Sequence, residues 1–193
     1  MHFICIEQET IGVADGVGGW AKNGINSGEY SRQLVKNAEL SIHKQKQQGN
    51  KIHPMKVLNE ALFKYEISRF ITDSMYFDFN LGNGYTCDDP SVAQEIKVPV
   101  KTWDVIVVGS DGLFDNVHDF ELEKLVRKGL VDLRELGTFS KMLAQKIAEY
   151  ALRSSQSKKN YTPFARECSK VGKHHVGGKP DDITVIVAHI LPL

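Results

Sequence analysis

Apolar residues along this chain form two kinds of pattern, short alternating or continuous runs and longer runs with helical spacing. The short runs predict strands and the long runs predict amphipathic helices, so we expect both element types. Strands are expected at residues 3–6 and 10–14 (a hairpin turning at 7–9), 75–80, 92–98, 105–109 and 183–190. Helices are expected to begin at an N-cap Ser27, at Pro54, at a capping Asp119 and at Thr138, the first ending near Gln45 and the last near Arg153.

Apolar side chains three and four positions apart within these helices are expected to face the interior. The expected core positions are Leu34, Val35, Ala38, Ile42, Val57, Leu58, Ala61, Leu62, Tyr65, Leu122, Leu125, Val126, Leu143, Ile147, Ala148 and Ala151.

The run from Val105 to Gly109 is continuous, β-branched and closed by glycine. It predicts a strand that is buried on both faces and stops at a tight turn. Asp111 and Asp115 follow at the end of this strand, and Gly112 leaves room beside them. Such an arrangement suits a hard cation. The alternative is an Asp-Gly turn that caps the next helix.

Carboxylates occur at two further ends of predicted strands. Asp15 and Gly16 follow the strand at 10–14, and Asp181 and Asp182 precede the strand at 183–190. Three acidic strand ends favour a metal site over a set of unrelated turns.

The composition is that of a globular domain without a strong charge bias. The chain has 193 residues, 41% of them hydrophobic, and 24 basic against 24 acidic side chains. This length predicts one domain, and the zero net charge gives no reason to expect a nucleic-acid partner. No apolar run approaches the length of a membrane span, and Met1-His-Phe-Ile4 is not expected to be a signal peptide because no basic segment precedes it.

Cysteine usage points to a reducing compartment inside the cell. Cys5, Cys87 and Cys168 are odd in number and form no CxxC pair, which argues against both a disulfide framework and a zinc site.

Aspartate and backbone carbonyl ligands favour Mg²⁺ or Mn²⁺ over zinc and copper, which prefer nitrogen and sulfur. Two such ions about 3.5 to 4 Å apart share a bridging water, lower its pKa and neutralise phosphate oxygens. The residues therefore predict metal-assisted hydrolysis of a phosphate ester. Nucleases and structural calcium sites also use carboxylate clusters, so these alternatives stay open.

Three segments together resemble the signature segments of the type 2C metal-dependent serine/threonine protein phosphatases. They are Ala14-Asp-Gly-Val-Gly-Gly-Trp20, Gly109-Ser-Asp-Gly-Leu-Phe-Asp-Asn116 and Gly177-Gly-Lys-Pro-Asp-Asp-Ile-Thr184. With Tyr161-Thr-Pro-Phe-Ala165, the first is similar to the mitochondrial and plastid branch of this family. The resemblance implies an α+β fold, an α-β-β-α sandwich of two antiparallel sheets flanked by helices.

The resemblance also implies a two-metal site for Mg²⁺ or Mn²⁺ and hydrolysis of phosphoserine and phosphothreonine through a metal-bridging water. By position, Asp15 would bridge both ions, the backbone carbonyl of Gly16 would bind one, and Asp111 and Asp181 would hold the other. Asp115 matches a position near a third, more weakly bound ion. Asp182 is expected to contact the metal ligands and not the metal itself.

Several family segments have no counterpart in this sequence. A Glu-Asp pair and an arginine expected upstream are absent, and so are two core-strand segments expected between Ile67 and Phe70. We therefore expect residues 1–193 to be one phosphatase-like domain that lacks an amino-terminal part and a central segment near 67–70. The missing ligands favour a second hypothesis, a catalytically impaired module of this fold that binds a partner protein.

The expected partner of the enzyme is a phosphoprotein substrate, and we expect a monomer. By the family resemblance the compartment is a mitochondrion or plastid, and otherwise the cytoplasm.

Overall fold

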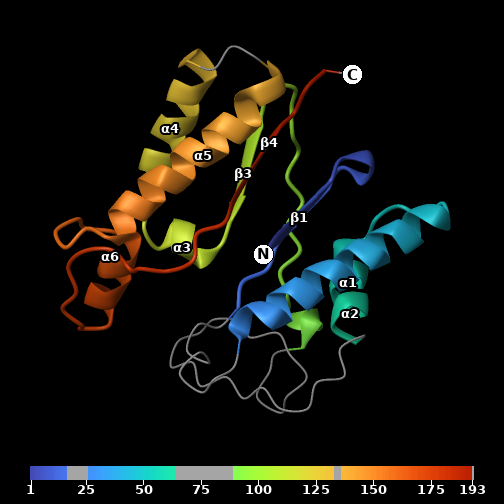
Figure 1. Cartoon of the computed structure of the whole chain (residues 1–193), viewed down its shortest axis with the longest axis horizontal. Coiled ribbons are helices and arrows are strands. Elements are labelled where there is room, and N and C mark those ends of the chain that lie inside the picture. Colours follow the sequence, from blue (N-terminus) through green and yellow to red (C-terminus); the bar gives the residue numbers. More distant parts are fainter. Residues whose placement is uncertain (17–25, 64–88, 133–135, 193) are drawn as a thin grey trace. The chain divides into compact units, whose positions relative to one another are not determined.

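The computed structural model describes residues 1–16, 26–63, 89–132 and 136–192 (Figure 1). Contacts divide the chain into two compact units, Met1–Val98 and Pro99–Leu193, and each unit is described by itself. The strand expected at 75–80, Tyr65 and Cys87 lie outside the described residues. None of the described helices combines the length and the apolar character needed to cross a membrane.

The first unit begins with the expected hairpin. Strands β1 (His2–Cys5) and β2 (Thr10–Val13) pair antiparallel, and the 3-10 turn η1 (Ile6–Gln8) joins them. Phe3 lies opposite Gly12 in this register. A Cβ on residue 12 would come within 2.2 Å of the Phe3 ring, so glycine leaves room for the ring at this position of the strand.

Two helices follow the hairpin, α1 (Ser27–Gln47) and α2 (Pro54–Phe63), and they lie side by side in Figure 1. Asn26, rather than the predicted Ser27, is the N-cap of α1, and its Oδ1 accepts a hydrogen bond from the backbone N–H of Gly28 at 3.1 Å. The core of this unit confirms the predicted stripes and consists of Ala38, Ile42, Val57 and Ala61, with Phe3, Leu34 and Ile52 packed against it.

A polar seam, formed by Asn37, Ser41 and Gln45 on α1, lies beside this core. All three side chains are at most 3% exposed. Asn37 Nδ2 donates to the carbonyl of Ala61 at 3.0 Å, and Ser41 Oγ donates to Glu60 at 2.8 Å. Because buried polar groups need partners, these bonds fix how α1 lies on α2.

The strand predicted at 92–98 is wrong. A short 3-10 turn, η3 (Pro90–Val92), is followed by residues without regular structure, and Ile96 and Val98 are 74% and 71% exposed. Alternating apolar residues favour an extended backbone, but a strand also needs a hydrogen-bonded neighbour. None of the described strands pairs with this segment.

The second unit is built on β3 (Val105–Gly109) and β4 (Val185–His189), which pair antiparallel with Val107 opposite Val187. Both strands were predicted. The prediction that β3 is buried on both faces is wrong, because each of its residues is only partly buried. In the described part of the chain β4 is its one neighbour, and a two-stranded sheet covers a strand incompletely.

Four helices complete this unit: α3 (Asp111–Phe114), α4 (Asp119–Asp132), α5 (Leu136–Ser155) and α6 (Pro163–Lys170). Figure 1 shows α4 beside α5, and α5 packs on β4. Helix α6 was not predicted. It is short, and Thr162 caps it by accepting a hydrogen bond from the backbone N–H of Ala165.

The core of the second unit gathers around α5 and consists of Leu113, Val117, Phe139, Leu143, Ile147, Ala151 and Val187. The predicted inward positions Leu143, Ile147 and Ala151 are fully buried. Each unit thus combines helices with an antiparallel strand pair, which confirms the α+β prediction. The interpretation of residues 1–193 as one domain stays a prediction.

Candidate metal centre

The segments Gly109–Asn116 and Gly177–Thr184 lie beside each other in the second unit. The end of β3 adjoins the start of β4 because the two strands are antiparallel. Ser110 continues the pairing beyond the strands: its Oγ donates to the carbonyl of Asp182 at 3.0 Å and accepts from the backbone N–H of Thr184 at 3.1 Å. Pairing of the two strands thereby places both acidic segments at one edge.

Three of the predicted carboxylates meet there in an acidic cluster, defined as Asp111, Asp115 and Asp181. The Lys179 ammonium contacts all of them, with Nζ at 2.9 Å from Asp111 Oδ2, 2.7 Å from Asp115 Oδ2 and 3.2 Å from Asp181 Oδ2. The four side chains are between 29% and 52% exposed, so the cluster is open to ions in solution.

Lys179 remains charged in this environment. Burial alone would lower the pKa of its ammonium, but hydrogen bonds to Asp115 and Asp111 outweigh burial and raise the pKa well above the usual range for lysine. The cluster therefore pairs three carboxylates with one permanent positive charge.

Asn116 is fully buried and fastens the backbone of Lys179. Its Oδ1 accepts from the Lys179 N–H at 2.8 Å, and its Nδ2 donates to the Lys179 carbonyl at 2.8 Å and to the Gly112 carbonyl at 2.9 Å. One side chain thus joins the two acidic segments through three hydrogen bonds. The sequence analysis predicted no role for Asn116 or Lys179, although both lie in the segments that carry the family resemblance.

Glycines allow these segments to approach backbone to backbone. A Cβ on Gly112 would lie 2.3 Å from the Asp182 carbonyl oxygen, and a Cβ on Gly178 would lie 2.2 Å from that of Ser154. Gly177 also has a φ of 108°, which non-glycine residues rarely adopt. The nearest atoms at both positions belong to the backbone and cannot move aside for a side chain. The site therefore requires glycine at positions 112 and 178.

We predict that Gly112→Ala lowers the free energy of unfolding by about 2 kcal/mol or more, because the new methyl group meets a backbone carbonyl that cannot rotate away. Urea unfolding followed by circular dichroism measures this loss. Gly137→Ala, in α5, is the matched control. No atom lies within 4 Å of the added methyl group, so the variant should be neutral or more stable by a few tenths of a kcal/mol. Equal stabilities for the two variants would contradict the packing argument.

The remaining predicted residues are Asp15, Gly16 and Asp182. Asp15 and Gly16 follow β2 in the first unit, where Asp15 Oδ1 accepts from the Gly16 N–H at 2.8 Å. The Asp182 side chain is exposed, and it is the backbone carbonyl of this residue that binds Ser110. The structure therefore brings together Asp111, Asp115 and Asp181.

The donor set of the cluster fits a hard divalent cation, because it consists of carboxylate oxygens. Among the described residues, however, no three acidic, histidine or cysteine side chains are arranged as the ligands of a metal ion. In the acidic cluster it is the Lys179 ammonium that the carboxylates contact.

The fold and the cluster define an α+β protein with three carboxylates gathered around one lysine at the edge of a strand pair. Over 98% of its length the chain is 34% identical to protein phosphatase 2C 80 and to protein phosphatase 2C 55, both of Arabidopsis thaliana, and it covers 53% and 47% of them. It is 30% identical to protein phosphatase 2C 24 of Oryza sativa subsp. japonica, of which it covers 72%. The chain belongs to the protein phosphatase 2C family.

The chain spans about half the length of the two Arabidopsis relatives. Its fold is similar to the solved structure of the photosystem II phosphatase PBCP, with a TM-score of 0.79 at 23% identity, over 100% of this chain and 92% of the other. No family model matches the chain. The relatives belong to a family of metal-dependent serine/threonine phosphatases, which agrees with the resemblance seen in the sequence.

Proposed function

We propose that this chain is the catalytic part of a Mg²⁺- or Mn²⁺-dependent phosphatase that removes phosphate from phosphoserine and phosphothreonine in proteins. The observation that carries the proposal is the acidic cluster, because its carboxylates come from the two segments by which the second unit resembles the family. The relatives named as protein phosphatases support the reaction class.

Two ions would be held as the family resemblance implies. Asp111 and Asp181 would bind one, Asp15 would bridge both, and the backbone carbonyl of Gly16 would bind the other. Asp115 would help to bind a weaker third ion. Asp182 would contact the metal ligands and not the ions. Bound metal ions would supply a water of lowered pKa and neutralise phosphate oxygens.

The chain's own contribution is to hold the carboxylates in fixed positions. Asn116 and Ser110 fasten the two acidic segments to each other, and Gly112 lets them approach. Ligands that are held in position before metal binds do not have to reorganise when it binds, so the chain's contribution is to preorganise the metal ligands.

A specific observation favours the second candidate, an impaired module that binds a partner protein. The alignment with protein phosphatase 2C 80 extends over 226 positions, more than the 193 residues of the chain, so it includes positions without a counterpart here. This excess supports the proposal that the chain lacks an internal segment that the relative has; its expected place near 67–70 stays a prediction. The monomeric state and the mitochondrial or plastid location stay predictions.

Hydrolysis of a phosphothreonine peptide by the metal-free chain separates the two candidates. We expect phosphate release after addition of Mn²⁺, none in the presence of a chelator, and recovery when Mn²⁺ is restored in excess. A folded chain that binds Mn²⁺ by calorimetry but releases no phosphate would contradict the enzyme and favour the module. Cleavage of DNA or RNA would instead favour a nuclease.

A further inference from the structure

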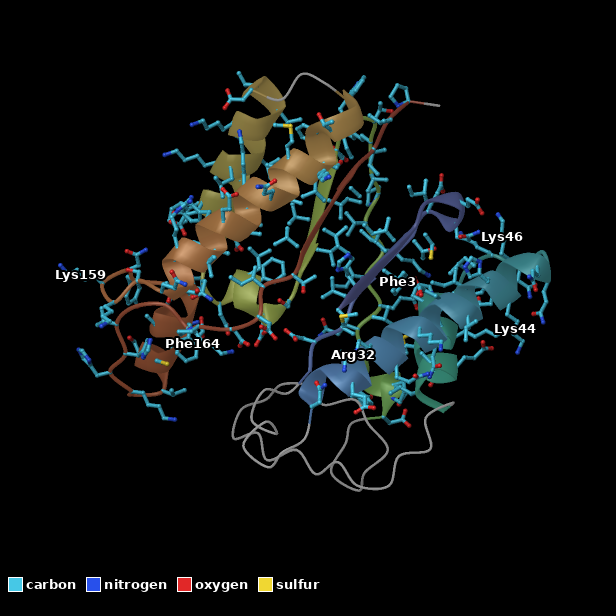
Figure 2. All side chains as sticks on the ribbon, in the orientation of Figure 1. Phe3, Arg32, Lys44, Lys46, Lys159 and Phe164 are labelled. Atoms are coloured by element: carbon cyan, nitrogen blue, oxygen red, sulfur yellow. The ribbon has the colours of Figure 1, made fainter. Side chains whose placement is uncertain are left out.

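Lys179 places a positive charge among the carboxylates that are proposed to bind metal. Its Nζ lies within 3.2 Å of an oxygen of Asp111, Asp115 and Asp181, and 5.7 Å from the centre of the Phe164 ring, which Figure 2 labels on α6. Among the described residues, no other lysine or arginine forms ion pairs with three carboxylates.

The backbone of Lys179 is fixed while its side chain is able to turn. Asn116 binds both the N–H and the carbonyl of Lys179, and the neighbouring Gly178 packs against the end of α5. From that fixed point a flexible four-carbon stem carries the ammonium to the cluster. Rotation of the stem would remove the charge from the carboxylates without moving the backbone that holds Asp181 in place.

Electrostatics favours a cation among these three carboxylates. Three carboxylates that share one ammonium at 2.7 to 3.2 Å lie close enough to repel one another. Water and salt reduce this repulsion because the side chains are partly exposed. Either the ammonium or a divalent cation relieves the repulsion, and both need the same oxygens.

We propose that Lys179 is a built-in competitor of the metal: its ammonium neutralises the acidic cluster when no metal is bound and must leave when a divalent cation binds. This inference rests on the proposed metal-binding function. Lys179 thereby weakens metal affinity and sets the concentration at which the site fills. The ammonium also offsets the repulsion among the carboxylates in the metal-free chain. The ligands therefore remain in place for an incoming ion.

Calorimetric titration of the metal-free chain with MnCl₂ tests the competition directly. We expect Lys179→Met to bind Mn²⁺ about tenfold more tightly than the unaltered chain, and Lys179→Arg to bind like the unaltered chain because it keeps the charge. Lys159→Met is the matched control. It makes the same change on the exposed loop after α5, where Figure 2 labels Lys159, and should leave the affinity unchanged.

The outcomes distinguish this inference from the proposed function. Equal or weaker Mn²⁺ binding by Lys179→Met than by the unaltered chain would overturn the competition and leave the metal site intact. Absence of binding in the unaltered chain, Lys179→Met and Lys159→Met would overturn the metal site and the competition together. Binding by Lys179→Met alone would confirm the competition in its strongest form.

A second measurement needs no variant and decides the question even if Lys179→Met fails to fold. Acetylation of the unaltered chain by an amine-reactive reagent, read out by peptide mass spectrometry, compares Lys179 with Lys159 as an internal reference. We expect saturating Mn²⁺ to raise the relative labelling rate of Lys179 several-fold, because the displaced amine becomes accessible. Unchanged or slower labelling, with Mn²⁺ binding shown by calorimetry, would overturn the proposal.

Discussion

Replacing Asn116 by alanine is expected to lower the free energy of unfolding by about 3 kcal/mol. The side chain is fully buried and makes three hydrogen bonds, all to backbone groups of Gly112 and Lys179. Truncation leaves these groups without their partner, and a buried unpaired polar group costs about 1 to 3 kcal/mol. This is a large share of the roughly 5 to 15 kcal/mol by which native proteins are stable.

Urea unfolding followed by circular dichroism measures the loss, and Asn160→Ala is the control. Asn160 is exposed, and the hydrogen bonds that tie it to Ser157 and Gly177 use its backbone N–H and carbonyl, which the substitution keeps. We expect the control to stay within about 0.5 kcal/mol of the unaltered chain. A loss below 1 kcal/mol for Asn116→Ala would show that Asn116 does not fasten the acidic segments.

The spacing of apolar residues was sufficient to predict the helices whose apolar side chains form the core. The stripe of Leu143, Ile147 and Ala151 repeats at helical spacing, and each of these side chains is fully buried on α5. The polar seam on α1 repeats at the same spacing, four residues apart, but polar side chains at such positions also occur on solvent-facing helices. Only the partners supplied by α2 show that the seam is buried.

Patterns failed where structure depends on a distant partner. Residues 92–98 alternate as a strand should, yet Ile96 and Val98 are largely exposed and no described strand pairs with them. The same limit explains β3, whose composition predicted full burial although its residues are partly exposed. An apolar composition allows a strand to be buried. How much of it is buried depends on how many strands and helices pack against it.

The carboxylates of the candidate site could be predicted from the sequence, but the lysine that neutralises them could not. Asp111, Asp115 and Asp181 stand at strand ends in the sequence, and antiparallel pairing of β3 with β4 brings those ends together. Lys179 is separated from Asp111 by 68 residues. A lysine two residues before a pair of aspartates is more often exposed, so only the structure could show its contact with Asp111.

Asp181→Asn is expected to reduce Mn²⁺-dependent hydrolysis of a phosphothreonine peptide by at least about 100-fold. Loss of residues that merely support metal ligands typically costs 10- to 100-fold, so loss of a proposed ligand should reach or exceed the upper figure. The change is nearly isosteric, and the amide oxygen of asparagine can still accept the hydrogen bond that Asp181 Oδ1 now receives from the backbone N–H of Asp182. The expected loss therefore reflects charge rather than folding.

The adjacent residue provides the matched control, because Asp182→Asn makes the same chemical change one position away. The Asp182 side chain is exposed, and its carbonyl, which binds Ser110, is untouched by the substitution. We expect its activity to fall by no more than about tenfold, the lower figure for a residue that supports metal ligands, with Mn²⁺ affinity measured alongside. Equal losses of activity in the two variants would mean that the total negative charge at this edge matters more than binding of the metal by Asp181. A loss confined to Asp181→Asn, together with weaker Mn²⁺ binding, would instead assign that carboxylate to the metal, since charge, size and chain position are otherwise matched.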